Sequence, residues 1–306
     1  MSTILIAGGT GLIGAQLSAR LLQEGHDVRH LSRKASPNSR YPIFEWNPDA
    51  GQMDPKALEG VDVVINLAGA GIADKPWTQG RKEIIISSRV KSTLLLKEAM
   101  LRMPQEKRPA VYISSAAIGY YGDRGSEWLE ESSKPGTGFL AESCIAWENA
   151  IQEVALEGIC RTVILRIGLV LTTRGGALPK MVLPVKWGVA PLFGRGDQWY
   201  SWIHIDDLTR LIQYAIQQPD LKGVFNGVSP NPIRQRDFMI QLGKAAGKHT
   251  LRFSLPVFAL RLMLGEMSDT VLSSSRVSAE KAVRAGFQFK FTDLRSAIVD
   301  LLERKI

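Results

Sequence analysis

Short apolar runs alternate with longer amphipathic stretches along the first two thirds of the chain. The apolar runs predict strands at Thr3–Ala7, Asp27–Leu31, Val61–Asn66, Ala110–Ser115, Thr162–Ile167 and Val224–Val228. Helical spacing of apolar residues predicts helices at Leu12–Gln23, Thr78–Arg102 and Gly138–Leu156. This alternation predicts an α/β fold, a doubly wound parallel sheet of the Rossmann type with helices on both faces.

The pattern changes after residue 170. Glycine and proline recur between residues 175 and 196, which predicts loops over the carboxyl edge of the sheet, where ligands of this fold class bind. The rest of the chain, from residue 229, has a mainly helical pattern. We therefore expect a dinucleotide-binding domain over residues 1–170, to which residues 200–228 return. Residues 171–199 and 229–306 should form a smaller, mainly helical C-terminal lobe that binds the substrate.

Composition narrows the class of protein. The 306 residues are 45% hydrophobic and 22% charged, as in ordinary globular proteins. No apolar run is long enough for a membrane helix, and the N-terminus has no basic leader. Cys144 and Cys160 are too few for a disulfide framework or a zinc site. We expect a cytoplasmic protein without a metal or a membrane partner, and its oligomeric state stays open.

The chain is basic, with a formal net charge of +8. The basic residues are spread along the sequence and form no stripe interleaved with aromatic residues. This distribution indicates a solvated basic surface and no nucleic-acid partner. A basic surface also suits an anionic small molecule.

The clearest motif follows the first predicted strand and opens the first predicted helix. It comprises Gly8, Gly9, Thr10, Gly11, Leu12, Ile13 and Gly14. The first glycines permit a tight turn, Gly11 lets the backbone approach a diphosphate, and Gly14 lets helix and strand pack closely. The N–H groups at the helix start would then face the anion. The motif predicts a dinucleotide site.

The residues after the second predicted strand favour NADP(H) over NAD(H). An acidic residue about 20 residues after the glycine loop would bind the two ribose hydroxyls of NAD. Ser32 and Arg33 stand there instead, and Arg33 can form a charge-assisted fork to a 2′-phosphate. The alternative is that Arg33 and Lys34 are merely solvated.

Several segments, together with the glycine loop, resemble the extended short-chain dehydrogenases/reductases, which include nucleotide-sugar epimerases and dehydratases. The segments are Asn66–Gly69, Ile113–Ser115 followed by Tyr121-Gly122, Arg166–Gly168 and Trp202–Asp207. Leu262–Met267 and Ala285–Phe289 resemble the extra C-terminal domain of the epimerase-like branch 39U. The resemblance implies an NADP(H) fold. The cofactor contacts that it implies are Leu67, Ala68, Gly69, Ser114, Ser115 and Gly168.

The resemblance also implies an acid–base pair that this chain lacks. Active members use a tyrosine followed four residues later by a lysine, and none of the six tyrosines here has a lysine in that position. Phe139 and Ser143 stand where the resemblance would place the pair. We therefore hold two hypotheses: an enzyme for a hydroxyl or carbonyl compound, perhaps sugar-derived, with other acid–base residues, or a catalytically silent NADP(H) sensor.

Other residues are candidates for chemistry. Tyr120 and Tyr121 could donate a proton over the nicotinamide, although loop packing is the competing interpretation. His204 or Asp206 should cap the helix that follows, rather than act in catalysis. Substrate contacts are predicted for Arg195, Gln198 and Trp202, and an anion could rest near Trp77, Arg81 and Lys82.

Overall fold

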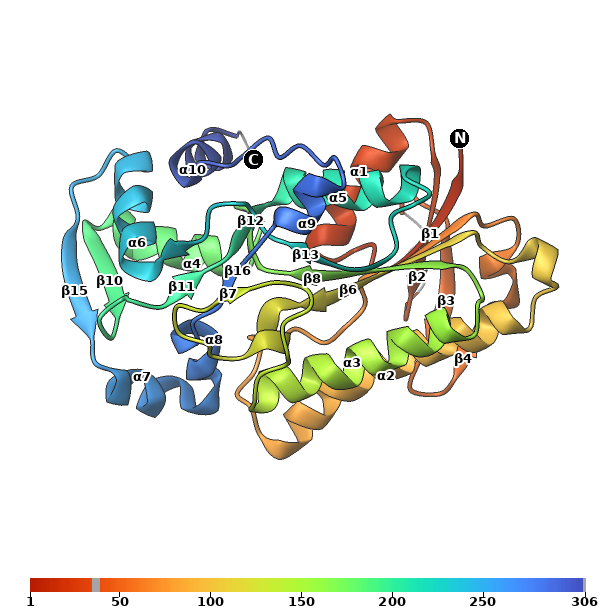
Figure 1. Ribbon diagram of the computed structural model, residues 1–306, viewed down its shortest axis with the longest axis horizontal. Coiled ribbons are helices and arrows are strands. Elements are labelled where there is room, and N and C mark those ends of the chain that lie inside the picture. The colour runs from red at the N-terminus through yellow and green to blue at the C-terminus, as the bar shows by residue number, and fades with distance from the viewer. Residues whose placement is uncertain (35–38, 305–306) are drawn as a thin grey trace.

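The computed structural model describes residues 1–34 and 39–304 (Figure 1). Its centre is an eight-stranded sheet in the order β13-β8-β6-β5-β1-β2-β3-β4, parallel except for the β3–β4 pair. The strands are β1 (Thr3–Ala7), β2 (Asp27–Ser32), β3 (Ile43–Asn47), β4 (Gln52–Met53), β5 (Val63–Asn66), β6 (Val111–Ala117), β8 (Arg161–Ile167) and β13 (Gly223–Gly227). All six strands predicted from the sequence are present. The β3–β4 hairpin was not predicted.

Helices cover both faces of this sheet, as Figure 1 shows. One layer contains α1 (Leu12–Gln23) and α5 (Ile205–Gln217), and the other contains α2 (Gln79–Leu101) and α3 (Phe139–Leu156). Because both faces are covered, the central strands are apolar at consecutive positions: Ile4, Leu5 and Ile6 of β1 are all fully buried. The doubly wound Rossmann fold is thus confirmed.

The strand order reverses direction beside β1. From β1 the chain adds β2 and β3 on one side, and then returns to add β5, β6, β8 and β13 on the other. Such a switch point leaves a crevice at the carboxyl ends of the two central strands, where ligands bind in open parallel sheets. Here the crevice lies after β1 and β5.

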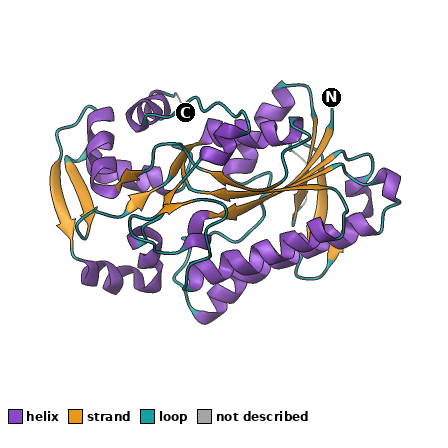
Figure 2. Ribbon diagram, viewed as in Figure 1, coloured by secondary structure: helices purple, strands orange, loops and turns teal. Residues whose placement is uncertain are grey.

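Most of the other helices and strands belong to the C-terminal part, and α4, α6, α7, β10 and β15 lie at the left of Figures 1 and 2. Its helices are α4 (Ala177–Lys186), α6 (Gln235–Ala245), α7 (Val257–Leu264), α8 (Asp269–Leu272), α9 (Glu280–Arg284) and α10 (Leu294–Glu303). Two-stranded sheets join β10 (Val189–Phe193) to β15 (Leu251–Leu255), β11 (Trp199–Tyr200) to β14 (Ile233–Arg234), β12 (Trp202–His204) to β9 (Leu169–Leu171) and β16 (Arg276–Val277) to β7 (Trp128–Leu129). The part is mainly helical, as predicted. No helix among the described residues has the length and apolar character needed to span a bilayer.

Candidate functional site

The glycine motif forms a tight turn at the switch point. Gly8 has a φ of +82°, a conformation that favours glycine, and the Gly11 N–H donates to the Gly8 carbonyl at 3.0 Å. Gly11 is the N-cap of α1 and provides no side-chain cap, and the first turn of α1 has no acidic residue. The helix start therefore offers N–H groups and a positive dipole end to an anion, with no carboxylate to repel it.

The glycines of this turn serve different purposes. A Cβ on Gly14 would lie 2.2 Å from the Gly8 oxygen, and one on Gly9 would lie 2.4 Å from the His30 ring. These two glycines are required by packing within the protein. A Cβ on Gly11 would meet only the Gly8 oxygen, at 3.2 Å, and Gly11 and Thr10 are exposed. The space in front of Gly11 is therefore open to a ligand.

The His30 side chain packs against the glycine turn and is neutral. It is buried on β2, and its Nε2 lies 2.7 Å from the Ser18 hydroxyl, which donates its only proton to the Gly14 carbonyl at 2.8 Å. His30 Nε2 must therefore donate to Ser18, which leaves Nδ1 unprotonated. Burial lowers the pKa of His30 to about 4.

This buried histidine should make the protein less stable in acid. The unfolded chain takes up the His30 proton near its ordinary pKa of about 6.5, but the folded chain does so only near 4, so stability is fully present above pH 6.5 and is lost as the pH falls between these values. Between pH 6.5 and 4.5 we expect His30 to account for about 2 kcal/mol. Urea unfolding should show a correspondingly smaller pH effect in His30→Gln, whose amide can still donate to Ser18. An identical pH effect in both proteins would contradict the assignment.

The end of β2 lies beside this turn. Ser32 closes the strand and its hydroxyl accepts from the Lys34 N–H at 3.3 Å, while the side chains of Arg33 and Lys34 are exposed. No described acidic side chain forms an ion pair with Arg33. Its guanidinium is thus available to an anion at the position where the sequence predicted a 2′-phosphate contact.

The carboxyl ends of β5 and β6 form the other wall of the crevice. The Asn66 amide is held by the Tyr112 hydroxyl at 3.2 Å, and its oxygen accepts from the Ala68 N–H at 3.1 Å. The Ser115 hydroxyl donates to the Asn66 carbonyl at 3.2 Å, and Ser114 is fully buried. These bonds fix the Leu67–Gly69 backbone. This segment packs closely against the glycine turn, since a Cβ on Gly8 would lie 2.9 Å from the Leu67 carbonyl.

Gly168 was predicted to contact the cofactor, and the structure provides a packing reason for its presence. A Cβ there would lie 2.3 Å from the Ser201 carbonyl oxygen and 2.7 Å from Val228. The Gly168 N–H donates to the Gly227 carbonyl at 3.1 Å. Glycine at this position lets the chain pass from β8 to β9 between two other segments.

Arg89 is a cation that the sequence analysis did not select. It lies on α2 behind Gly69, whose hypothetical Cβ would be 3.1 Å from the guanidinium carbon. The guanidinium stacks 5.0 Å from the Trp147 ring and donates to the Ile85 carbonyl at 2.8 Å, and no described carboxylate pairs with it. Burial lowers the pKa of Arg89. A partly buried, unpaired arginine behind Gly69 supplies positive charge to the crevice.

Tyr120 and Tyr121 differ sharply in their surroundings. Tyr121 is fully buried, and its hydroxyl donates to Asn226 at 2.7 Å and accepts from Arg166 at 2.9 Å. Burial raises the pKa of Tyr121 to about 12. The structure therefore assigns Tyr121 to a buried network, which corrects the suggestion that it donates a proton to a substrate. Tyr120 is half-buried, with its ring 3.5 Å from the Arg166 guanidinium carbon.

Phe139 is the first residue of α3. Its ring packs edge-on against Trp77 at 4.8 Å, and the Lys82 ammonium lies 5.3 Å from its centre. Lys82 also pairs with Glu266 of the C-terminal part. Lys82 therefore joins α2 and the start of α3 to the C-terminal part.

A cavity of about 480 Å³ lies in the C-terminal part. Its lining includes Arg195 and Gln198, two of the predicted substrate residues, together with Arg234 and Arg261. Asp197 is the lining carboxylate and pairs with Arg195 at 3.1 Å. Asp197 also pairs with Arg234 at 3.8 Å and with Arg236 at 2.7 Å. The three lining arginines still outnumber this one lining carboxylate, which makes the cavity suitable for an anionic group.

Trp202 does not line this cavity. It is fully buried on β12, and its indole N–H donates to the Asn231 carbonyl at 2.9 Å. The structure places Trp202 in the core between β9 and α6, so the prediction that it contacts substrate is wrong. The apolar residues around Trp202 in the sequence could have indicated that this side chain is buried.

His204 caps α5, as the sequence predicted. Its Nδ1 accepts from the Asp206 N–H at 3.1 Å, so the neutral ring carries its proton on Nε2, which faces Asp300 at 3.2 Å. His204, Asp206 and Asp300 are close enough to hold a metal. However, a protonated Nε2 is no ligand, and Arg304 already pairs with both carboxylates. This cluster ties α10 to the Rossmann domain.

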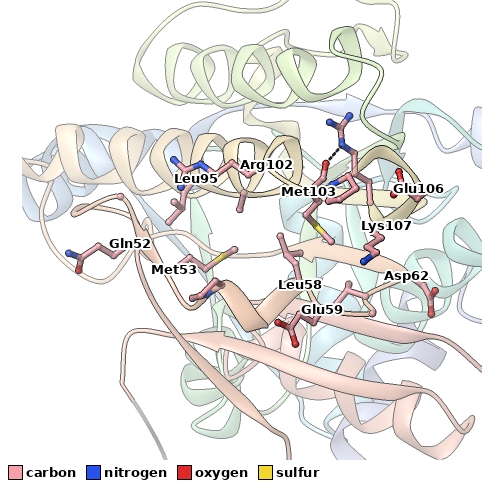
Figure 3. A pocket seen from close by; sticks show the side chains of 17 residues that line it. Gln52, Met53, Leu58, Glu59, Asp62, Leu95, Arg102, Met103, Glu106 and Lys107 are labelled. Atoms are coloured by element: carbon pink, nitrogen blue, oxygen red, sulfur yellow. Dashed lines mark hydrogen bonds between the residues drawn. The ribbon is translucent and has the colours of Figure 1, made fainter.

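The structure also contains a cavity of about 930 Å³ far from the glycine turn (Figure 3). Its lining includes Val61 and Asp62, just before β5, and Pro104, Glu106, Lys107 and Arg108, just before β6. It therefore lies at the amino ends of the parallel strands, on the edge opposite the crevice. It is not part of the candidate site.

Comparison with known proteins places this geometry in context. The sequence matches the model of the NAD dependent epimerase/dehydratase family over residues 4–226, and a domain of unknown function, DUF1731, over residues 255–301. Epimerase family protein Mb2239 of Mycobacterium bovis is 36% identical over 298 residues, which cover 97% of this chain and 96% of that protein. The epimerase family protein SDR39U1 homolog, chloroplastic, of Arabidopsis thaliana is 34% identical over 305 residues, covering 98% and 87%.

A solved structure shows the same fold over the whole chain. The crystal structure of human epimerase family protein SDR39U1 (isoform2) with NADPH superimposes with a TM-score of 0.88 at 28% identity, covering 99% of this chain and all of that one. These matches agree with the resemblance read from the sequence, including the extra C-terminal domain.

Proposed function

The chain belongs to the NAD dependent epimerase/dehydratase family, and from that premise we propose that it binds NADP(H) at the glycine turn and acts on a small hydroxyl or carbonyl compound. The observation that carries the proposal is the open space in front of Gly11, at a helix start without a side-chain cap. Arg33 follows the neighbouring strand β2 and forms an ion pair with no described carboxylate. A related protein, human SDR39U1, was crystallised with NADPH.

The residues of the crevice fit such a cofactor. Backbone N–H groups from Gly9 to Ile13 would hold the diphosphate, and Arg33 with Ser32 would hold the 2′-phosphate. Leu67–Gly69, with Arg89 behind Gly69, would line the adenosine side, while Ser115 on β6 would face the nicotinamide half. When bound, NADP(H) supplies or accepts the hydride.

Arg33 should determine the preference for the phosphorylated cofactor. Arg33→Asp removes a cation and adds repulsion, so we expect NADPH to bind about 30–100-fold more weakly while NADH changes by less than about threefold. Calorimetric titration of both cofactors measures the two effects. Equal losses for NADPH and NADH would mean that Arg33 does not touch the 2′-phosphate.

We propose that the substrate lies between the crevice and the C-terminal cavity, with an anionic group on Arg195, Arg234 and Arg261. Residues 1–170 with 200–228 would bind the cofactor, and residues 171–199 with 229–306 would bind the substrate. Tyr120 is the proton donor that this arrangement favours, because its hydroxyl forms no hydrogen bond to another described residue, whereas that of Tyr121 is fully engaged.

The proposal is tested by turnover. Purified protein with NADPH is mixed with a panel of sugars, nucleotide sugars, aldehydes and ketones, and cofactor oxidation is followed by absorbance. At least one carbonyl compound that carries a negative charge should be reduced, and Tyr120→Phe should lower kcat more than it raises KM. Tight NADPH binding without turnover of any compound would reject the enzymatic proposal.

A second function is favoured by the missing tyrosine–lysine pair. With Phe139 and Ser143 at the helix start, the protein would sense NADP(H) without catalysis and act through a partner. NADPH should then protect the C-terminal part from hydrogen exchange in the absence of any substrate. Cofactor consumption that follows substrate concentration would exclude this alternative. For either function we propose a cytoplasmic protein that binds neither nucleic acid nor membranes.

A further inference from the structure

The outermost strand of the C-terminal part is an exposed, apolar sheet edge. β15 pairs with β10 on one side only, and no other described strand pairs with its second edge. Figure 1 shows β15 at the far left of the molecule. Leu251 is 81% exposed and Phe253 is 58% exposed, and their register partners Val189 and Pro191 lie on the same face of β10. Natural proteins usually shield such an edge with charge or a covering segment.

The backbone of β15 has free hydrogen-bonding groups at two positions. Leu251 donates to the Gly188 carbonyl at 2.8 Å, and the Leu255 carbonyl accepts from Gly194 at 2.8 Å, so these residues face β10. Because backbone polar groups alternate in direction along a strand, those of Arg252 and Ser254 point away from β10. They form no backbone hydrogen bonds with other described residues.

We propose that a second copy of this chain adds its own β15 antiparallel to this edge, on a two-fold axis at Phe253. Arg252 then exchanges two hydrogen bonds with Ser254 of the second copy, and Ser254 does the same with its Arg252. Phe253 faces Phe253 of the second copy, and Leu251 faces Leu255. The result is a continuous four-stranded sheet with apolar pairs on one face.

The sequence of β15 selects this register. A two-fold axis at Arg252 would set two guanidinium groups directly opposite each other. An axis at Ser254 would pair Arg252 with Pro256, which has no N–H to donate. Only the axis at Phe253 uses both outward-facing residues without opposing like charges.

A lipid surface suits this edge less well than a second strand. Trp187 on the adjoining α4 segment is 81% exposed, and an exposed tryptophan beside basic residues could also enter a bilayer interface. However, the unpaired N–H and C=O groups of Arg252 and Ser254 would remain unsatisfied in hydrocarbon. A second β15 edge satisfies all of them.

The dimer interface would also lie next to the C-terminal cavity. The Ser254 hydroxyl donates to the Gly194 carbonyl, and Gly194 and Val257, at the ends of β10 and β15, line that cavity. Pairing of the two edges would fix these strand ends in place. Because Arg195 follows β10 by two residues, its position would be fixed as well.

Charge placed at the axis provides the test. Because Phe253 faces its own copy, Phe253→Lys and Phe253→Glu should each weaken self-association at least about tenfold by self-repulsion. An equimolar mixture of the two should associate as tightly as the wild type or more tightly. Sedimentation velocity from about 1 to 300 µM suits the weak dimer that a short strand pair makes. The matched controls Val283→Lys and Val283→Glu, at an exposed aliphatic residue on α9, should leave association unchanged.

Three results would overturn the proposal. The wild type could stay monomeric at the highest concentration, or the single Phe253 variants could dimerise like the wild type. The mixture of the two variants could also fail to restore association. A monomeric wild type that floats with phosphatidylglycerol vesicles, and loses this binding in Phe253→Glu, would assign the surface to lipid.

Discussion

Substitution of Gly11 with valine should abolish NADPH binding and leave the fold intact. Gly11 is exposed at the N-cap of α1, with a φ of −73° and a ψ of 175°, a conformation that valine adopts readily. Its Cβ would meet only the Gly8 oxygen, at 3.2 Å. The isopropyl group would instead occupy the space that a diphosphate needs to reach the N–H groups of the turn.

The expected loss of NADPH affinity is at least about 100-fold, or about 2.7 kcal/mol, with a melting temperature close to that of the wild type. Calorimetric titration and thermal unfolding measure the two quantities. Gly80→Val is the matched control, because Gly80 lies in the first turn of α2 with nothing near its missing Cβ. Normal NADPH affinity in Gly11→Val would show that the diphosphate does not rest on this turn.

The contrast with Gly14 shows why the choice of glycine matters. A Cβ on Gly14 would lie 2.2 Å from the Gly8 oxygen and 2.7 Å from the Gly9 Cα, both of which are backbone atoms. Substitution there would distort the turn itself, and lost binding would not reveal what the turn binds. Substitution of Gly11 therefore tests contact with the ligand without disturbing the packing of the turn.

The sequence predicts the parts of the molecule that depend on neighbouring residues. The strand β1, the turn at Gly8–Gly14 and the helix α1 lie within 21 consecutive residues, and the predicted bounds of both elements match the structure. The cap at His204 was also predictable, because a cap bonds to the residue two positions later. The strand, the turn, the helix and the cap are all determined by residues close together in the sequence.

The features that the sequence analysis missed depend on distant partners. Tyr121 is buried by Arg166 and by Asn226, which is 105 residues away. The Trp202 indole N–H donates to the carbonyl of Asn231, 29 residues later in the sequence. Strand β15 pairs with β10, about 60 residues earlier. The charge behind Gly69 comes from Arg89 on a helix whose face could not be assigned from the sequence. Only the folded chain brings these groups together.

The greatest loss of stability should follow removal of the carboxylate from the buried pair between Arg166 and Glu148. The two side chains are 4% and 2% exposed, and two bonds of 2.8 Å join them. Arg166 also donates to the Tyr121 hydroxyl and to the Glu131 carbonyl. Burial opposes the charge on Arg166, but the hydrogen bonds and charge of Glu148 keep its pKa above the ordinary arginine value.

Glu148→Gln should therefore lower the free energy of unfolding by about 3–5 kcal/mol, because it leaves a buried guanidinium without a counter-charge. Urea unfolding measures the loss. Glu280→Gln, the same change in the exposed pair with Arg284, should cost less than about 1 kcal/mol. The double variant Glu148→Leu/Arg166→Met should be more stable than Glu148→Gln, since it removes the unpaired charge as well as the pair. If Glu148→Gln cost no more than the exposed control, the buried guanidinium of Arg166 would not depend on Glu148 for its counter-charge, and the role assigned to this pair would be wrong.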